Sequence, residues 1–307
     1  MRAMIGLVSL MAAAIAADSV YNGRWDLTTG AARRGAWWVE LNGVGTPNAS
    51  GKFVSAYAGD MNKIDEISVV NGGVRWVIKP PDGPPLVYTA KLAGGSLEGT
   101  MTREGQSGPA TKFTGVRAPE INEKDDGTWK KGTTVELFDR KDLNGWHALV
   151  PGAEMKWSVT DGVLKNAPPT TDIVSDRNFW NFDTHVEFRI VEHSNSGIGL
   201  RGRYEIQILD DYGRPPNTHT AAALYSRVAP SVNASKPPGE WQTYDIRLVG
   251  RDLTVVHNGT KVLDHVHVDG LTAIANNSDE GEPGPFIVQG DHSNVEIRKF
   301  TVTSLVH

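Results

Sequence analysis

A carboxylate, an amide and a guanidinium come close together in the stretch Asn195–Asp210, which reads NSGIGLRGRYEIQILD. Glu205 and Gln207 alternate with apolar neighbours there, as in a strand whose successive side chains point to opposite faces. Polar groups on a half-buried strand must be solvated, ion-paired or in contact with a ligand. A solvent-facing strand with a cross-strand pair between an arginine and a glutamate is the simplest interpretation, and a ligand site is the alternative.

Two further groups of polar residues could carry chemistry. Gln289–Ser293, with the sequence QGDHS, lies between two apolar strands, where polar side chains can line a cleft or simply form a turn. His185 and Glu187 alternate outward on a strand near His193, which favours a solvated face over a metal site. Three more histidines alternate with valines as in an exposed hairpin and are discounted as metal ligands: His257, His265 and His267.

Composition excludes several classes of function. The chain has no cysteine, so thiol catalysis and thiolate metal sites are absent. It also lacks the serine-hydrolase elbow, the zinc-protease HExxH and the glycine-rich nucleotide loops. The net charge of −5, without any lysine- or arginine-rich run, gives no reason to expect nucleic acid or an anionic membrane as partner. Carboxylates, amides, histidines and arginines on strands therefore remain.

The first 17 residues have the pattern of a secretory signal peptide. Arg2 supplies the positive start, Ile5–Ile15 is a short apolar run, and Ala14–Ala16 is a small-x-small cleavage motif. The apolar run is too short to span a bilayer comfortably, and without cysteine there is no lipid anchor. We therefore expect an exported protein, periplasmic or secreted, with no membrane anchor.

Two β-rich regions must position the candidate residues. Residues 18–119 contain about eight short alternating segments separated by glycine-rich turns, which predicts a small antiparallel barrel or sandwich acting as an accessory domain. Residues 120–132 are charged and poor in apolar side chains, as expected of a linker. The aromatic side chains expected to anchor the first core are Trp25, Trp37, Trp38 and Trp76.

Residues 133–307 form a second all-β pattern. About ten to twelve strands are expected, and no convincing helix interrupts them. The strongest hairpin signal is Asn258-Gly259 between two apolar segments. Such a pattern predicts a two-sheet β-sandwich or jelly roll.

This second region resembles the 3-keto-disaccharide hydrolase domain family, within the concanavalin A-like lectin/glucanase superfamily. The resemblance extends over about residues 133–305, and its motifs occur in the family's order. These motifs are Leu137–Asp139, Leu143–Trp146, Trp157–Leu164, Asn181–Asp183, Glu187–Arg189, Asn195–Ile198, Leu200–Gly202, Tyr204–Asp210, Gly239–Trp241, Gln289–His292 and Val295–Arg298. Ser293, where the family usually has glycine, departs from the pattern.

The resemblance implies a concanavalin A-like jelly roll whose concave sheet binds carbohydrate, and an activity on 3-keto-glycosides. Glu205 is the expected general base or a ligand of an ion that polarises the ketone, and Arg201 is the expected positive group. The acid is expected to be His292 or Asp291. A two-carboxylate hydrolase would instead use Glu205 with Asp210. The expected substrate-binding residues are Asn195, Arg201, Gln207, Gln289, Trp180 and Tyr225.

Three functions stay open at this point. A glycoside-cleaving enzyme requires an acid and a base in one cleft, so Glu205 should lie near Asp210, Asp291 or His292. A non-catalytic, lectin-like module needs only aromatic and hydrogen-bonding groups. A cell-surface adhesion protein is the weakest of the three. A divalent cation such as Ca²⁺ or Zn²⁺ is compatible with the residues but not demanded by them, so the cofactor is left undefined.

Overall fold

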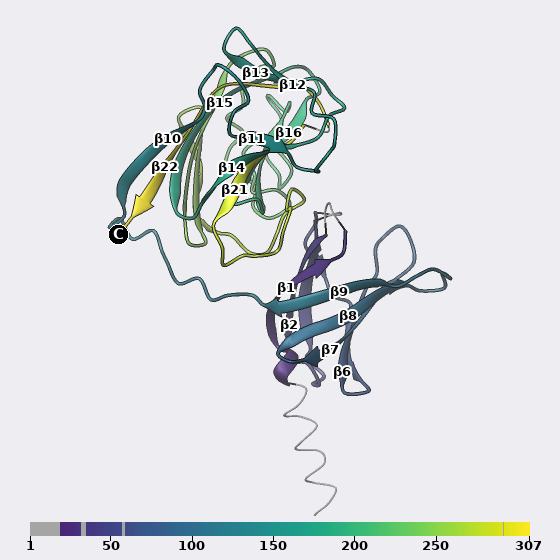
Figure 1. Cartoon of the computed structure of the whole chain (residues 1–307). Helices are drawn as coiled ribbons and strands as arrows, with labels where there is room; N and C mark the ends of the chain where they lie inside the picture. The colour runs from purple at the N-terminus through teal and green to yellow at the C-terminus, as the bar shows by residue number, and fades with distance from the viewer. Residues whose placement is uncertain (1–18, 32–34, 57–58, 291) are drawn as a thin grey trace, which may run out of the picture.

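The computed structural model describes residues 19–31, 35–56, 59–290 and 292–307 (Figure 1). Their regular structure is β-strand, apart from one short 3₁₀ turn, η1 (Ser19–Tyr21), and no α-helix occurs among them. These residues accordingly contain no helix with the length and apolar character needed to cross a bilayer. The predicted signal peptide and Asp291 lie outside the described residues.

The N-terminal unit is one curled antiparallel sheet of nine strands, in the order β4-β3-β2-β1-β9-β8-β7-β6-β5. Trp25 and Trp37 pack inside it, and Trp76 stacks on Tyr88 with ring centroids 5.1 Å apart. This confirms the small antiparallel β-domain. Its strands are β1 (Gly23–Thr29), β2 (Ala36–Asn42), β3 (Ser50–Ser55), β4 (Asn62–Lys63), β5 (Glu66–Val70), β6 (Gly73–Ile78), β7 (Leu86–Ala93), β8 (Ser96–Arg103) and β9 (Thr111–Arg117).

The C-terminal unit is a sandwich of an eight-stranded and a five-stranded sheet, which confirms the jelly-roll prediction. Phe286 of the smaller sheet contacts Phe182 and Phe300 of the larger, with ring centroids 4.9 and 5.2 Å apart. The larger sheet contains β12 (Trp157–Thr160), β13 (Val163–Asn166), β22 (Val295–Val306), β15 (Phe182–Ile190), β18 (Gln242–Val249), β19 (Asp252–His257) and β20 (Thr260–His267), with β10 (Lys130–Phe138) paired to β22. The smaller contains β11 (Trp146–Ala148), β14 (Ile173–Phe179), β21 (Gly284–Val288), β16 (Asn195–Leu200) and β17 (Tyr204–Leu209).

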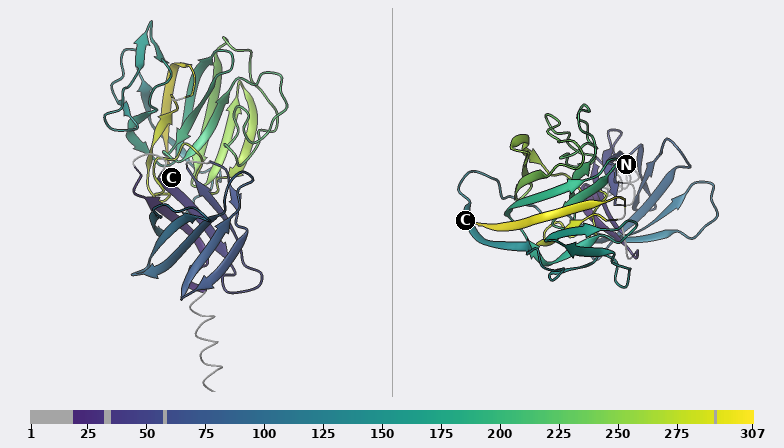
Figure 2. Two further views of the ribbon diagram at one scale, coloured as in Figure 1. Left: turned by 90° about the vertical axis from the view of Figure 1, so that its right-hand side faces the viewer. Right: turned by 90° about the horizontal axis from the view of Figure 1, so that it is seen from above.

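The two units meet through an apolar cluster. The N-terminal unit lies against one end of the sandwich (Figure 2). Trp38 is fully buried there, together with Leu271 and Ala275 from the segment that joins β20 to β21. The prediction that Trp38 anchors the N-terminal core is therefore wrong. On β2 it points to the opposite face from Trp37, where it packs with Val54 and Ala56 of its own unit and with Leu271 and Ala275 of the second unit.

Buried charges also cross this junction. Asp26 of β1 and Glu280 of the β20–β21 segment are both buried, and the backbone N–H of Glu280 donates to Asp26 Oδ2 at 3.4 Å. Arg251 forms an ion pair with Glu280 at 2.8 Å, and the Tyr204 hydroxyl donates to the same carboxylate at 3.0 Å. Burial, followed by the negative charge of Glu280, raises the pKa of Asp26 to about 8. This shift favours the protonated form of Asp26.

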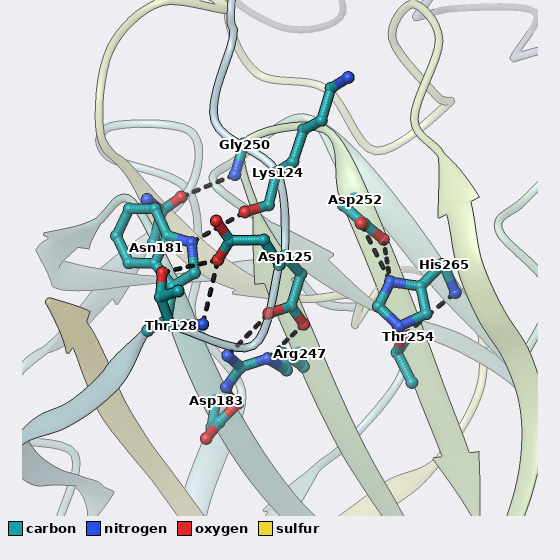
Figure 3. A network of polar contacts seen from close by, with 12 residues as sticks. Lys124, Asp125, Thr128, Asn181, Asp183, Arg247, Gly250, Asp252, Thr254 and His265 are labelled. Carbon is teal, nitrogen blue, oxygen red and sulfur yellow. Dashed lines mark hydrogen bonds and ion pairs between the residues drawn. The ribbon is translucent and has the colours of Figure 1, made fainter. Parts of the chain in front are cut away.

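The connecting segment is fixed to the C-terminal unit (Figure 3). Asp125 accepts from Arg247 of β18 at 2.5 and 2.9 Å, and Arg247 also donates to Asp183 of β15. Trp180 donates to Glu123 Oε1 at 3.0 Å. β9 ends at Arg117 and β10 begins at Lys130, close to the predicted limits of the linker. Whether the two units fold separately stays a prediction.

Candidate functional site

The outer face of β17 is polar and yet covered. Ile206 points into the sandwich core, while Glu205 and Gln207 point away from it. These two polar side chains are only 2% and 3% exposed. Burying a carboxylate and an amide is unfavourable unless the surroundings compensate it. Their burial therefore indicates a binding or catalytic site and not a solvated strand face.

Glycine on the neighbouring strand makes room for the carboxylate. Gly197 of β16 pairs with Gln207, and Gly199 pairs with Glu205. A Cβ atom placed on Gly197 would lie 2.6 Å from Glu205 Oε1 and 2.9 Å from its Cγ. Such a contact is shorter than real side chains allow, so the Glu205 carboxylate lies directly over the backbone of Gly197.

Two glutamines flank this glycine. Gln207 is its partner on β17, and on the other side the N–H of Gln289 donates to the Gly197 carbonyl at 3.0 Å. Both glutamine Oε1 atoms are buried and accept no hydrogen bond from the described part of the chain. Gln207 Nε2 donates to Asn195 Oδ1 at 3.4 Å. Buried acceptors of this kind are normally satisfied, so a ligand hydroxyl or a water is the expected partner.

The structure joins two clusters that are about ninety positions apart in the sequence. Ser293 Oγ donates to the Asn195 carbonyl at 2.8 Å and also accepts from the Asn195 N–H. Asn166 donates to the carbonyls of Gly290 and Ser293. These bonds fix the segment after β21 beside the start of β16. His292, an exposed residue of this segment, is thereby placed near the same end of the sheet.

Two loop segments bind the backbone of the strand at Glu205. Thr272 Oγ1 accepts from the N–H of Glu205 at 2.9 Å, and the N–H of Tyr225 donates to the Glu205 carbonyl at 3.0 Å. Burial raises the pKa of Tyr225, and the negative charges of Glu205 and Asp60 raise it further. The Tyr225 ring is half-buried, and an aromatic ring of this kind can stack on a sugar.

Arg201 and Trp180 are placed elsewhere. Arg201 is 0% exposed and donates to the Trp180 carbonyl, the Gly250 carbonyl and Asn181 Oδ1 at 2.7, 2.7 and 3.1 Å. Its guanidinium stacks on the Trp180 ring at 3.9 Å. Because these donors and the stacked face of the guanidinium are already engaged within the protein, Arg201 serves packing, which corrects the prediction of a substrate-binding guanidinium. Trp180 is likewise used for packing.

Asp210 does not pair with Glu205. The two are five residues apart, roughly 16 Å along an extended strand, and odd and even positions face opposite sides. Asp210 Oδ2 instead accepts from the N–H of His193 in the turn before β16. Two-carboxylate glycosidases need their carboxyl groups within about 10 Å. The alternative prediction of a Glu205–Asp210 pair is therefore wrong.

The remaining histidines have other environments. His185 lies on the outer face of the larger sheet, paired with Asp245 at 2.6 Å and with Glu187 at 3.3 Å, as a solvated face would have it. His257 is buried, not exposed, because it packs against Tyr244, and burial lowers its pKa to about 4. Among the described residues, no cluster of three or more histidine or acidic side chains is arranged to hold a metal ion.

Three residues near the site were not expected from the sequence: Thr272, His219 and Asp60. Thr272 lies in the β20–β21 segment, His219 precedes Tyr225 in a loop, and Asp60 belongs to the N-terminal unit. His219 Nε2 is 3.3 Å from Asp60 Oδ1. No motif marks these residues, because their proximity depends on how loops and units pack.

Comparison with known proteins agrees with this architecture. Residues 133–303, more than half of the chain, match the family described as 3-keto-alpha-glucoside-1,2-lyase-like domains. The chain belongs to this family. The match confirms the resemblance identified from the sequence, and it includes each site residue described above except Asp60.

Individual relatives are more distant. The chain is 26% identical to a 3-keto-disaccharide hydrolase of Bacteroides thetaiotaomicron, in an alignment that covers 43% of this chain and 58% of the relative. It therefore spans less than two thirds of that protein. A structure of a proposed glycosyl hydrolase from Parabacteroides distasonis is 27% identical, with a TM-score of 0.50, over 60% of this chain and 94% of the other. The similarities support a carbohydrate-active role.

Proposed function

We propose that the chain cleaves 3-keto-glycosides by elimination at a site built around Glu205. The observation that supports this most directly is the buried carboxylate above Gly197, flanked by two glutamines with unsatisfied oxygens. A carboxylate held in a covered site is a suitable general base. The family description names a 1,2-lyase-like activity on a 3-keto-alpha-glucoside, and that activity requires a base.

The reaction follows from the acidity that a ketone gives to its neighbouring carbon. Glu205 removes the proton at C2, and the electron pair of that C–H bond becomes an enolate across C2, C3 and the ketone oxygen. The enolate re-forms the ketone as the C1–O bond breaks, which leaves a C1=C2 double bond. The departing oxygen takes a proton from an acid. Later addition of water across the double bond makes the overall result a hydrolysis.

The amides and the exposed histidine have the remaining roles. Gln207 and Gln289 each carry a donor and an acceptor, so they can hold the ketone oxygen and the sugar hydroxyls. His292 is the proposed acid, since imidazole transfers protons readily near neutral pH. Asp291 was the other candidate acid in the sequence and lies outside the described residues. Arg201 has no part in this scheme.

A non-catalytic sugar-binding module is the alternative function. Tyr225 beside polar amides would suit a lectin as well as an enzyme. A carboxylate can accept hydrogen bonds from sugar hydroxyls in a lectin too, but the match to 1,2-lyase-like domains supports a reactive role for this one. We therefore favour the enzyme.

The decisive experiment offers two sugars to two proteins. Wild type and Glu205→Gln are incubated with a 3-keto-disaccharide and with its unoxidised parent, and released monosaccharide is quantified. Elimination predicts cleavage of the keto sugar only, reduced by about a hundredfold or more in the variant. Equal turnover of both sugars would exclude the elimination. Binding of the keto sugar without cleavage would favour the lectin.

A further inference from the structure

A polar cluster joins the N-terminal unit to the rim of the site. Asp60 lies between β3 and β4 and is 60% exposed. One of its oxygens, Oδ1, contacts His219 Nε2 at 3.3 Å and accepts from the Ser226 hydroxyl. Both partners belong to the loop between β17 and β18 in the other unit. A single carboxylate of the N-terminal unit thus binds two points of one loop.

The same loop carries the aromatic ring nearest to Glu205. The His219 and Tyr225 rings meet edge to face, with centroids 4.9 Å apart and an angle of 89°. Tyr225 donates from its backbone to the Glu205 carbonyl. The contacts therefore run without interruption from Asp60 through His219 and Tyr225 to the strand that carries the proposed base.

The backbone beside Asp60 packs on the same ring. A Cβ atom on Gly59 would lie 3.3 Å from the Tyr225 ring and 2.6 Å from the Ala273 side chain, so the backbone of the N-terminal unit is in close contact there. Arg227 donates to the carbonyls of Gly59 and Asp269 at 3.2 and 3.3 Å. These bonds hold together the Gly59 backbone, the Tyr225 loop and the β20–β21 segment.

Docking of the two units does not depend on Asp60. The Trp38 cluster and the buried Asp26–Glu280 contact already fix the junction, and Lys52 pairs with Asp269 at 3.4 Å elsewhere on it. By contrast, the partners of the Asp60 side chain within the described residues, His219 and Ser226, belong to the loop at the rim of the site. Its effect should therefore be local to the position of His219 and Tyr225.

We propose that the N-terminal unit forms one wall of the sugar site and that Asp60 is a positioning residue, holding His219 and Tyr225 against the bound sugar. This inference rests on the proposed function, because it assigns the wall to the same site. It gives the accessory unit a role in substrate binding. The chemical step stays with Glu205 and the acid.

The test compares three variants of the full chain on a 3-keto-disaccharide. Asp60→Ala removes both contacts and should raise KM about tenfold, since hydrogen bonds to charged groups are worth more than neutral ones, while kcat stays within about twofold. Asp60→Asn keeps an acceptor oxygen and should recover most of the lost affinity. Lys52→Met removes an ion pair of the same junction away from the site and should leave KM unchanged.

Amide hydrogen exchange supplies a second readout. Residues 217–228 should exchange faster in Asp60→Ala than in wild type or Lys52→Met, while β16 and β17 stay protected. If wild type is active and Asp60→Ala has the same KM and the same hydrogen exchange as wild type, the N-terminal unit does not form a wall of the site. The proposed function would be unaffected by that result. An equal KM increase in Lys52→Met would also overturn the proposed wall, because the effect would then be general loosening of the junction. Absence of any turnover in wild type overturns both proposals.

Discussion

The outer faces of the two sheets in the C-terminal unit both carry polar residues that alternate with apolar ones, but these polar residues differ in burial. On the smaller sheet, Glu205 and Gln207 of β17 are buried. On the larger sheet, His185 and Glu187 of β15 alternate in the same way but remain partly open to solvent, and they pair with charges on adjoining strands. A strand that alternates polar and apolar residues can thus become either a site or a surface.

The difference in burial comes from the segments that pack around the smaller sheet. The loop containing Tyr225 pairs with the edge of β17, Ile274 of the β20–β21 segment packs on the outer face of the smaller sheet, and the N-terminal unit contacts both segments. Polar groups buried there have lost water, so each unsatisfied oxygen favours a ligand. Charges on the larger sheet keep their hydration and gain little from pairing.

The largest expected effect separates the two glutamates. Glu205→Gln should reduce kcat/KM on a 3-keto-disaccharide by about a hundredfold or more, because a neutral amide cannot remove a proton. Glu187→Gln makes the same change on the open sheet and should alter activity by less than about twofold. Steady-state kinetics on both variants measures the ratio. If both variants lost the same factor in kcat/KM, the outer faces of the two sheets would not differ in function.

Filling the space beneath the carboxylate should have the next largest effect. Gly197→Ala places a methyl group 2.6 Å from Glu205 Oε1, so the carboxylate must move. We expect a loss of about ten- to a hundredfold in kcat, since small displacements of a base are costly. Gly108→Ala is the control, because a Cβ there meets no atom within 4 Å. An active Gly197→Ala with the native fold by circular dichroism would contradict the geometry.

The free energy of unfolding should depend on pH through Asp26, at the junction of the two units. Because the pKa of Asp26 is raised to about 8 in the folded protein, the folded state holds a proton that the unfolded state releases near pH 4. Stability should therefore fall as pH rises from about 4 to about 8, by at most about 1.4 kcal/mol per pH unit. Asp26→Asn should flatten this profile and be more stable than wild type at pH 8.

Urea unfolding between pH 5 and pH 9 measures this effect. The exposed Asp82 provides the control, because Asp82→Asn should follow the wild-type profile. A wild-type profile that rises with pH over this range would show that the Asp26 proton does not contribute to stability.

The smallest effect is expected where a charge pair lies on the open sheet. Asp125 of the linker accepts from Arg247, which lowers the pKa of Asp125. Asp125→Asn should cost about 1 kcal/mol or less, and the difference from wild type should vanish as pH falls through the lowered pKa. Thermal unfolding at low and high salt checks this. A larger loss that salt does not change would mean that the linker is part of the core.

The sequence predicted most of the strands. Period-two alternation and turns such as Asn258-Gly259 depend on neighbouring residues only, so β15, β17, β19 and β20 could be placed by inspection. Trp38 and His257 were misplaced because a strand pattern shows that two faces exist but not what covers each. Arg201 was misplaced for a related reason, since a guanidinium suits both a substrate and a set of buried carbonyls.

Part of the site was also available from the sequence. Glu205, Gln207 and Gln289 were identified because polar residues interrupt apolar strands, and family motifs include all three. The export signal and the roles of His292 and Asp291 stay predictions. Asp60, His219 and Thr272 were missed, because each comes from a different loop and acquires its place only by long-range packing.

The amino-acid sequence by itself therefore determined the all-β class, the division into two β-rich regions, the family and the polar strand at its centre. All of these rest on local periodicity, turn chemistry and motif order, which a linear chain expresses directly. Tertiary structure alone decided which polar face is buried, which glycine lies beneath the carboxylate and which residues of the N-terminal unit reach the site. Those depend on contacts between residues up to 254 positions apart, and only the packed chain brings them together.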